Sequence, residues 1–262
     1  MRDVLEAIAD GELSPAAAEA KLRGYVTSDA GRFDAAREQR SGVPEAILAS
    51  GKTVEEVSTL VEASLETTDR AIATRVDEKT ASAIRQRLAD TQPEATIQFD
   101  ERAGTLIVHG ESFEPPKLDA AVGIVTAGTS DAVPAGEAAA IAAEMGAEVQ
   151  RVADIGVASL DRLLDQLPSL REQDVLIVAA GREGALPTVL AGLVDVPILA
   201  IPVSTGYGHG GDGEAALSGM LQSCTALTVV NVDAGFTAGA QAGLIARQLD
   251  SARADAAEIQ SE

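Results

Sequence analysis

Hydrophobic positions follow a helical period in the first part of the chain. In TVEEVSTLVEASLE, residues 53–66, apolar residues recur at three- and four-residue spacing, which predicts a short amphipathic helix. Thr53 and Glu56 have the spacing of a capping box, which favours a helix start there. Residues 97–111 alternate apolar and polar positions around a glycine-containing turn, which predicts a β-hairpin. We therefore expect an N-terminal α+β domain over residues 1–118.

The pattern then changes to short, unbroken apolar runs. They are AVGIVTAG (121–128), DVLIVAAG (174–181), VPILAIPV (196–203) and ALTVVNVD (226–233). Such runs are typical of buried parallel strands, because helices cover both faces of the sheet. We therefore expect an α/β fold, with a doubly wound, mainly parallel sheet over residues 119–250 after the smaller domain. Residues 251–262 are polar and lack a long apolar stripe, so we expect a flexible, frayed tail there.

The segments that follow these runs form the candidate site, because ligands of doubly wound sheets bind beyond the carboxyl ends of the strands. GTSD precedes an alanine-rich helix whose N-terminus suits a phosphate, and its aspartate suits a ribose hydroxyl. GREGALP places Glu183 at the same edge as a general base or a partner for a sugar. STGYGHGG is glycine-rich enough to close over a ligand, although an ordinary turn remains the alternative for all these segments. The candidate substrate-binding residues here are Gly128, Thr129, Ser130, Asp131, Gly181, Gly184, Ser204 and Gly206.

A group of arginines stands out in the N-terminal region, which is otherwise poor in positive charge. Arg32, Arg37 and Arg40 lie within GRFDAAREQR together with Asp34. Arginines suit phosphates and subunit contacts, so Arg32 and Arg37 are further candidates for substrate binding. A solvated helix face, or a contact with an adjoining subunit, remains the alternative.

The charge balance excludes two classes of partner. The chain has 41 acidic and 20 basic residues, a formal net charge of −21. This charge repels nucleic acid and anionic membranes at long range, so we expect no nucleic acid and no membrane partner. The chain contains no apolar stretch long enough to cross a bilayer, and we expect a cytoplasmic protein. Acidic residues abound and lysine is scarce, which suggests adaptation to high salt as a hypothesis.

The single cysteine cannot form an internal disulfide, and two histidines are too few for a typical zinc site. Cys224 lies in ALSGMLQSCTALTVV, between a predicted helix and a predicted strand. Its residue type and place allow either a small buried hydrophobe or a nucleophile. We assign no catalytic role to His109 or His209.

Several of these motifs in order resemble the LarB family. TAGTSD, AAGREGALPTVLAGL, VPILAIPVSTGYG, MLxSC and NVDAGF carry the resemblance, and GRFDxxRxxRxGxPE with GKT extends it into the N-terminal half. Two positions depart from the family pattern, because Arg182 replaces a methionine and Ala234 replaces an asparagine. The C-terminal part also resembles PurE, phosphoribosyl-aminoimidazole carboxylase, through GTSD and AGxxxAxLP. The histidines of that enzyme are missing from AEVQRVADIG and GREGALP, which argues against simple purine chemistry.

The resemblance implies an activity. Members of the family carboxylate the pyridinium ring of nicotinic acid adenine dinucleotide with CO2 or bicarbonate and cleave its phosphoanhydride. The products are pyridinium-3,5-biscarboxylic acid mononucleotide, a precursor in nickel-pincer cofactor biosynthesis, and AMP. An aminoimidazole ribonucleotide carboxylase or mutase, or a non-catalytic nucleotide-binding protein, is the alternative.

The resemblance also implies roles for individual residues. Cys224 is the expected covalent catalyst and Glu183 the expected proton carrier, while Ser130, Asp131 and the loop at Gly206 hold the ribose phosphate. No organic cofactor is expected, and Mg²⁺ bridging the pyrophosphate is consistent with the chemistry, with its ligands left open. The likeness to PurE suggests a homo-oligomer, specifically an octamer.

Overall fold

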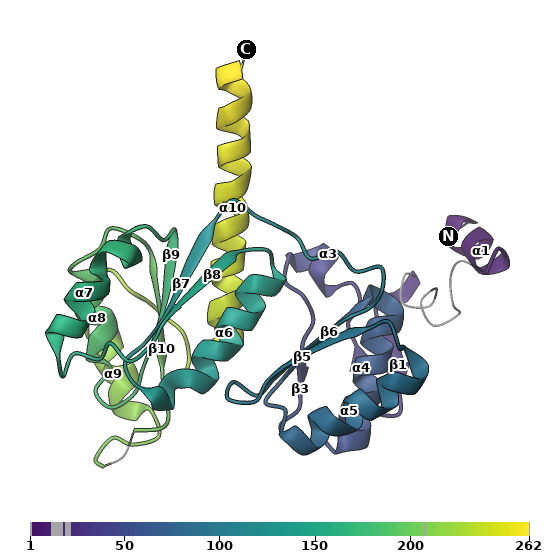
Figure 1. Cartoon of the computed structure of the whole chain (residues 1–262), viewed down its shortest axis with the longest axis horizontal. Coiled ribbons are helices and arrows are strands. Elements are labelled where there is room, and N and C mark those ends of the chain that lie inside the picture. Colours follow the sequence, from purple (N-terminus) through teal and green to yellow (C-terminus); the bar gives the residue numbers. More distant parts are fainter. Residues whose placement is uncertain (1, 12–17, 19–21, 207, 262) are drawn as a thin grey trace. The chain divides into compact units, whose positions relative to one another are not determined.

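The computed structural model describes residues 2–11, 18, 22–206 and 208–261 (Figure 1). The chain divides into two compact units, Met1–Glu114 and Pro115–Glu262. The predicted boundary after residue 118 lies in the loop between the last strand of the first unit and the first strand of the second. Within the described ranges, no helix is long and apolar enough to span a membrane.

The N-terminal unit is a small α+β domain. Its four-stranded sheet has the order β3-β4-β6-β5, in which β3 and β4 are parallel and the other pairs are antiparallel. The predicted hairpin is present as β5 and β6. The described elements are α1 (Arg2–Ala9), β1 (Val26–Ser28), β2 (Gly31–Phe33), α3 (Arg37–Ser41), β3 (Ile47–Leu48), α4 (Val54–Thr68), β4 (Arg70–Thr74), α5 (Glu78–Thr91), β5 (Thr96–Asp100) and β6 (Thr105–His109).

Local sequence signals account for the two long helices of this unit. The Thr53 side chain accepts a hydrogen bond from the Glu56 amide, and the Glu56 carboxylate accepts one from the Thr53 amide, so the predicted capping box starts α4. Asp77 caps α5 in the same way, by accepting a bond from the Thr80 amide. Both helices bury one apolar side against the sheet, where Val61 and other aliphatic side chains form a continuous core.

The C-terminal unit is the predicted doubly wound α/β domain. Its five-stranded sheet has the order β11-β10-β9-β7-β8, and every pairing in it is parallel. The described elements are β7 (Ala121–Thr126), η1 (Thr129–Asp131), α6 (Ala132–Glu144), β8 (Glu148–Val152), α7 (Leu160–Arg171), β9 (Val175–Ala180), α8 (Ala185–Ala191), β10 (Ile198–Pro202), α9 (Glu214–Leu221), β11 (Thr228–Val229) and α10 (Gly235–Ser261). Because β7 lies between β8 and β9, the strand order reverses there, which is the ligand position of such folds.

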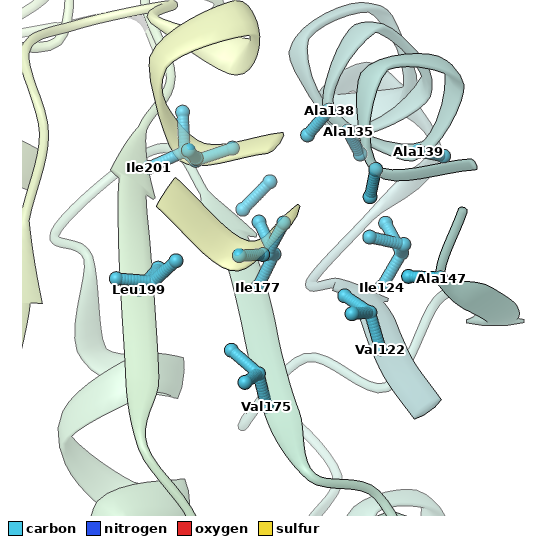
Figure 2. Close-up of a cluster of buried hydrophobic side chains, with 14 of the residues drawn as sticks. Val122, Ile124, Ala135, Ala138, Ala139, Ala147, Val175, Ile177, Leu199 and Ile201 are labelled. Carbon is cyan, nitrogen blue, oxygen red and sulfur yellow. The ribbon is translucent and has the colours of Figure 1, made fainter. Parts of the chain in front are cut away.

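Both faces of this sheet are buried, which explains the unbroken apolar runs. One face packs on α6 and α10, and the other on α7, α8 and α9 (Figure 1). Figure 2 shows the first of these cores, where Ile124 of β7, Ile177 of β9 and Ile201 of β10 point to the same side as the alanines of α6. Successive residues such as Leu176 and Ile177 serve opposite cores, so the whole strand must be apolar.

Small residues bring α6 and α10 close together. A Cβ atom at Gly239 would lie 2.5 Å from the carbonyl oxygen of Ala138, and one at Gly235 would lie 2.2 Å from that of Pro134. Such distances are far shorter than a carbon–oxygen contact allows. The glycines of GFTAGAQAG therefore set the helix separation on this face.

The C-terminal segment differs from the sequence prediction. We expected a frayed tail over residues 251–262, but residues 251–261 continue α10 as helix. Alanine-rich sequence favours helix, and Arg253 ties the segment to the sheet by donating to the Asp174 carboxylate at 2.5 and 3.0 Å and to the Asp119 carbonyl. The exposed last turns extend beyond the sheet (Figure 1), so the helix persists without a packed side.

Candidate functional site

A cavity of about 390 Å³ opens at the carboxyl edge of the parallel sheet. Four chain segments line it, and they follow β7, β8, β9 and β10. The strand order reverses between β7 and β9, so the segments that follow these two strands run in different directions and leave a space between them. The described lining residues are Ala127, Gly128, Ser130, Asp131, Gly156, Val157, Ala158, Ala180, Gly181, Arg182, Glu183, Ala185, Leu186, Thr205 and Gly206.

Asp131 is the buried acid of this cavity, with only 2% of its surface exposed. Its Oδ2 atom accepts a hydrogen bond of 2.8 Å from the Gly128 amide. Burial raises the pKa of the Asp131 carboxyl, although hydrogen bonds from the main chain of Gly128 and Gly181 and from Ser130 act against the rise. The carboxyl therefore joins the exits of β7 and β9 and forms part of the cavity wall.

The segment after β9 carries two exposed charged side chains of the cavity. Arg182 and Glu183 are both exposed and line it. The Gly184 amide donates to the Gly181 carbonyl at 2.9 Å, which closes a tight turn. Gly184 itself serves the fold, because its φ is 65° and a Cβ atom there would lie 2.6 Å from the Ala216 carbonyl oxygen of α9.

The glycine-rich loop after β10 lies against this turn. A Cβ atom at Gly206 would lie 3.1 Å from the Arg182 amide nitrogen, so the two main chains are in close contact. Ser204 does not line the cavity, and its amide donates to the Asp233 carboxylate at 3.0 Å. Tyr207 falls outside the described residues.

Most of the candidate residues at the carboxyl edge meet in one cavity. Those that line it are Gly128, Ser130, Asp131, Gly181, Glu183 and Gly206, whereas Thr129, Gly184 and Ser204 do not. The segment Gly156–Ala158 also lines the cavity and was not predicted from the sequence, because the preceding strand β8 lies at the sheet edge and exposes most of its residues. Its sequence, EVQRV, therefore lacks the unbroken apolar run by which the other strands were found.

Cys224 is exposed and does not line this cavity. It lies between the end of α9 at Leu221 and the start of β11 at Thr228. Every lining segment follows a strand, whereas Cys224 precedes one. In a parallel sheet these positions belong to opposite edges, so one subunit does not place the thiol in its own cavity.

The arginines of the N-terminal unit are held by local partners. Arg37 pairs with Glu45 at 3.2 Å, and Arg40 donates to both oxygens of Asp34, at 3.0 and 2.6 Å. The guanidinium of Arg32 lies 5.5 Å from the centre of the Tyr25 ring. These contacts organise the turn and the short helix α3, and phosphate binding by Arg32 and Arg37 stays a prediction.

The expected Mg²⁺ stays a prediction, and the described side chains offer no cluster of ligands for it. Among the residues that the structure describes, no group of three histidine, cysteine or acidic side chains is placed to hold a metal ion. Mg²⁺ commonly keeps several waters and takes ligands from substrate phosphates, but the protein side chains here do not form a cage for it.

Two family models match the chain. The one described as LarB/PurE-like N-terminal domain matches residues 25–110, and the one described as AIR carboxylase matches residues 121–261. The uncharacterized protein MJ0165 of Methanocaldococcus jannaschii is 37% identical over 255 residues, which are 94% of this chain and 97% of that protein. The crystal structure of Treponema denticola PurE is 17% identical with a TM-score of 0.38, and the match covers 54% of this chain and 96% of that one.

Proposed function

The chain belongs to the LarB family and carries a PurE-like domain of the carboxylase type, and from this premise we propose that it carboxylates nicotinic acid adenine dinucleotide. The ring carbon would gain a carboxyl group from CO2 or bicarbonate. Water would cleave the phosphoanhydride, giving pyridinium-3,5-biscarboxylic acid mononucleotide and AMP. The product would serve nickel-pincer cofactor biosynthesis.

The observation that carries this proposal is the cavity at the switch point of the sheet. Its main-chain amides and the hydroxyls of Ser130 and Thr205 suit a ribose phosphate. Glu183 lies in its wall, where a carboxylate is able to accept a proton from a bound ring.

The chemistry needs a covalent catalyst, because a pyridinium ring is electron-poor while attack on CO2 requires a nucleophilic carbon. Addition of the Cys224 thiolate to the ring gives a neutral enamine. The enamine carbon attacks CO2 and forms the new carbon–carbon bond. Glu183 takes the ring proton from that carbon, and expulsion of the thiolate restores the aromatic cation, so the cysteine is regenerated.

The position of Cys224 adds a condition to this scheme. Because the exposed thiol does not line the cavity of its own subunit, it must reach the ring from a second copy of the chain. The proposed enzyme is therefore a homo-oligomer, in which the cavity of one subunit receives the segment between α9 and β11 of another. An octamer is the form that the likeness to PurE suggests.

The test is direct turnover. Purified protein is incubated in high salt with nicotinic acid adenine dinucleotide, ¹³C-bicarbonate and magnesium, and the products are followed by mass spectrometry. We expect AMP and a labelled, carboxylated mononucleotide in equal amounts. If the dinucleotide is recovered unchanged although it binds, the chain is a nucleotide-binding protein and the proposal fails.

A second candidate is an aminoimidazole ribonucleotide carboxylase or mutase, which the match of residues 121–261 to AIR carboxylase favours. The same preparation is given aminoimidazole ribonucleotide with bicarbonate. Formation of the carboxylated imidazole, without turnover of the dinucleotide, would select this function instead.

A further inference from the structure

A second cavity of about 370 Å³ adjoins the first. Arg182, Glu183 and Gly206 line both. The other described residues of the second cavity are Gly208, His209, Gly210 and Ala215. Two cavities of similar size with a shared wall suit a ligand of two similar parts, with its connecting group at that wall.

Positive charge is rare in these cavities. In a chain with 41 acidic and 20 basic residues, Arg182 and His209 are the described lining residues able to carry a positive charge. Asp131 and Glu183 are the acids. Since the protein repels anions at long range, an anionic ligand needs a local cation, and Arg182 lies at the wall that both cavities share.

The main chain of Arg182 is fixed in an uncommon conformation. Its φ is 53°, in the left-handed region that residues other than glycine seldom adopt. The Gly206 main chain packs against it, and the turn from Gly181 to Gly184 holds it in place. This turn fixes the point at the shared wall from which the exposed Arg182 side chain leaves the main chain.

We propose that Arg182 binds the phosphoanhydride of a dinucleotide, with one nucleoside half in each cavity. A guanidinium donates two parallel hydrogen bonds to phosphate oxygens, which a neutral side chain at this position cannot do. The inference rests on the proposed function for the identity of the dinucleotide. It adds the position of the bound phosphates and the residue that binds them.

Calorimetry with nicotinic acid adenine dinucleotide tests the role of the guanidinium. We expect Arg182→Met to weaken binding by about 10- to 100-fold, as for loss of a charge-assisted contact. Arg171→Met is the matched control, because it removes the same charge from an exposed arginine at the end of α7, outside both cavities. It should bind as the wild type does. Wild-type affinity in Arg182→Met would overturn the inference.

Arg182→Gly separates a binding role from a structural one. Glycine adopts a positive φ without strain, so the melting temperature should stay at or above that of the wild type. Binding of the dinucleotide should still weaken as it does in Arg182→Met. A lower melting temperature with unchanged affinity would show that the arginine serves the fold, and the inference would fall.

Simultaneous binding tests the two-cavity arrangement. We expect adenosine to bind with unchanged affinity when nicotinic acid riboside is present at saturation, because each nucleoside occupies its own cavity and neither carries a phosphate that competes for Arg182. Mutual exclusion would overturn the arrangement. If the dinucleotide binds in an Arg182-dependent way but is not turned over, the proposed function alone is refuted. If it is turned over equally well without Arg182, this inference alone is refuted. If it does not bind, both are refuted.

Discussion

The two edges of the parallel sheet hold carboxyl groups in opposite electrostatic states. At the carboxyl edge, burial raises the pKa of Asp131, and main-chain amides and Ser130 oppose the rise. At the amino edge, the Arg253 guanidinium lowers the pKa of Asp174, whose Oδ2 atom accepts a bond of 2.8 Å from the Ala121 amide. The amino edge is thus stabilised by an ion pair, while the carboxyl edge keeps an acid at an electrostatic cost.

The difference indicates which edge is built for binding. Carboxyl groups with a raised pKa in a cavity are typical of functional sites, where the fold tolerates an unfavourable charge. A compensated pair such as Asp174 and Arg253 is typical of structural contacts. The exposed Cys224 complicates the comparison, because it precedes a strand and yet is the proposed catalyst.

The largest expected effect is the loss of carboxylation when Cys224, at the amino edge, or Glu183, at the carboxyl edge, is replaced. Cys224→Ala and Glu183→Gln should each lower carboxylation by at least about 100-fold, since one removes the proposed covalent catalyst and the other the proposed proton acceptor. If the thiol and the cavity come from different copies, oligomers reassembled from both variants regain sites with both residues. Mass spectrometry of the mixture should then show partial recovery of product.

Two controls accompany the mixing experiment. Each variant alone, taken through the same dissociation and reassembly, should stay inactive and keep the wild-type oligomer size. Mixed oligomers without any activity would show that both residues must belong to one subunit. An active Cys224→Ala variant would contradict covalent catalysis altogether.

The next effect concerns the buried acid. The raised pKa of Asp131 means that the folded state favours the neutral carboxyl. The free energy of unfolding is therefore higher at acid pH, and it falls as pH rises through the raised pKa. Asp131→Asn removes the loss, and the wild type should therefore lose stability relative to the variant as pH rises. Each unit of pKa shift corresponds to about 1.4 kcal/mol in the free energy of unfolding. Urea unfolding across pH 4 to 8 measures it, and parallel curves would contradict the prediction.

The paired acid should give the opposite slope. Because the pKa of Asp174 is lowered, its charged carboxylate stabilises the fold when the pH is above the ordinary pKa of the group. This stabilisation is lost as the pH falls through the lowered pKa. Wild type should lose stability relative to Asp174→Asn on the acid side. The effect should be smaller than for Asp131, because Arg253 is exposed and water screens the pair. Urea unfolding from about pH 2 to 4, below the range used for Asp131, reports it, and a slope of equal sign for both variants would reject the comparison.

The smallest effect concerns the end of α10. Ending the chain after Asp250 removes Arg253 and its bonds to Asp174, and the melting temperature should fall by about 2–4 °C. Ending it after Arg253 keeps these bonds and removes the exposed turns, so the melting temperature should change less. Calorimetric scans of the two shortened chains decide the matter, and equal melting temperatures would show that Arg253 contributes nothing.

Much of the fold could be predicted from residue patterns. Three apolar runs correspond to β7, β9 and β10, because a strand buried on both faces has to be apolar throughout. The fourth run contains β11, a two-residue edge strand that is only partly buried. The capping box at Thr53 is formed as predicted, since it depends on residues three positions apart. The edge strand β8 was missed because solvent covers part of it and permits charged residues.

The candidate site could be predicted only in part. Strand exits converge by the topology of a parallel sheet, so Gly128, Gly181 and Gly206 meet as expected. Gly184 has the same place in a motif but is required by α9, and Ser204 is engaged by Asp233. A motif does not reveal which of its residues face a ligand and which face another helix.

The sequence by itself determined the class of sheet, the helix starts and the edge of the sheet at which the candidate site lies, because each follows from the period of apolar residues and from contacts a few positions apart. The tertiary structure decided which side chains share a cavity, that Arg182 lies at a wall common to two of them, and that Cys224 lies apart from both. These relations join residues distant in the chain, and they depend on how strands and helices pack rather than on any local pattern.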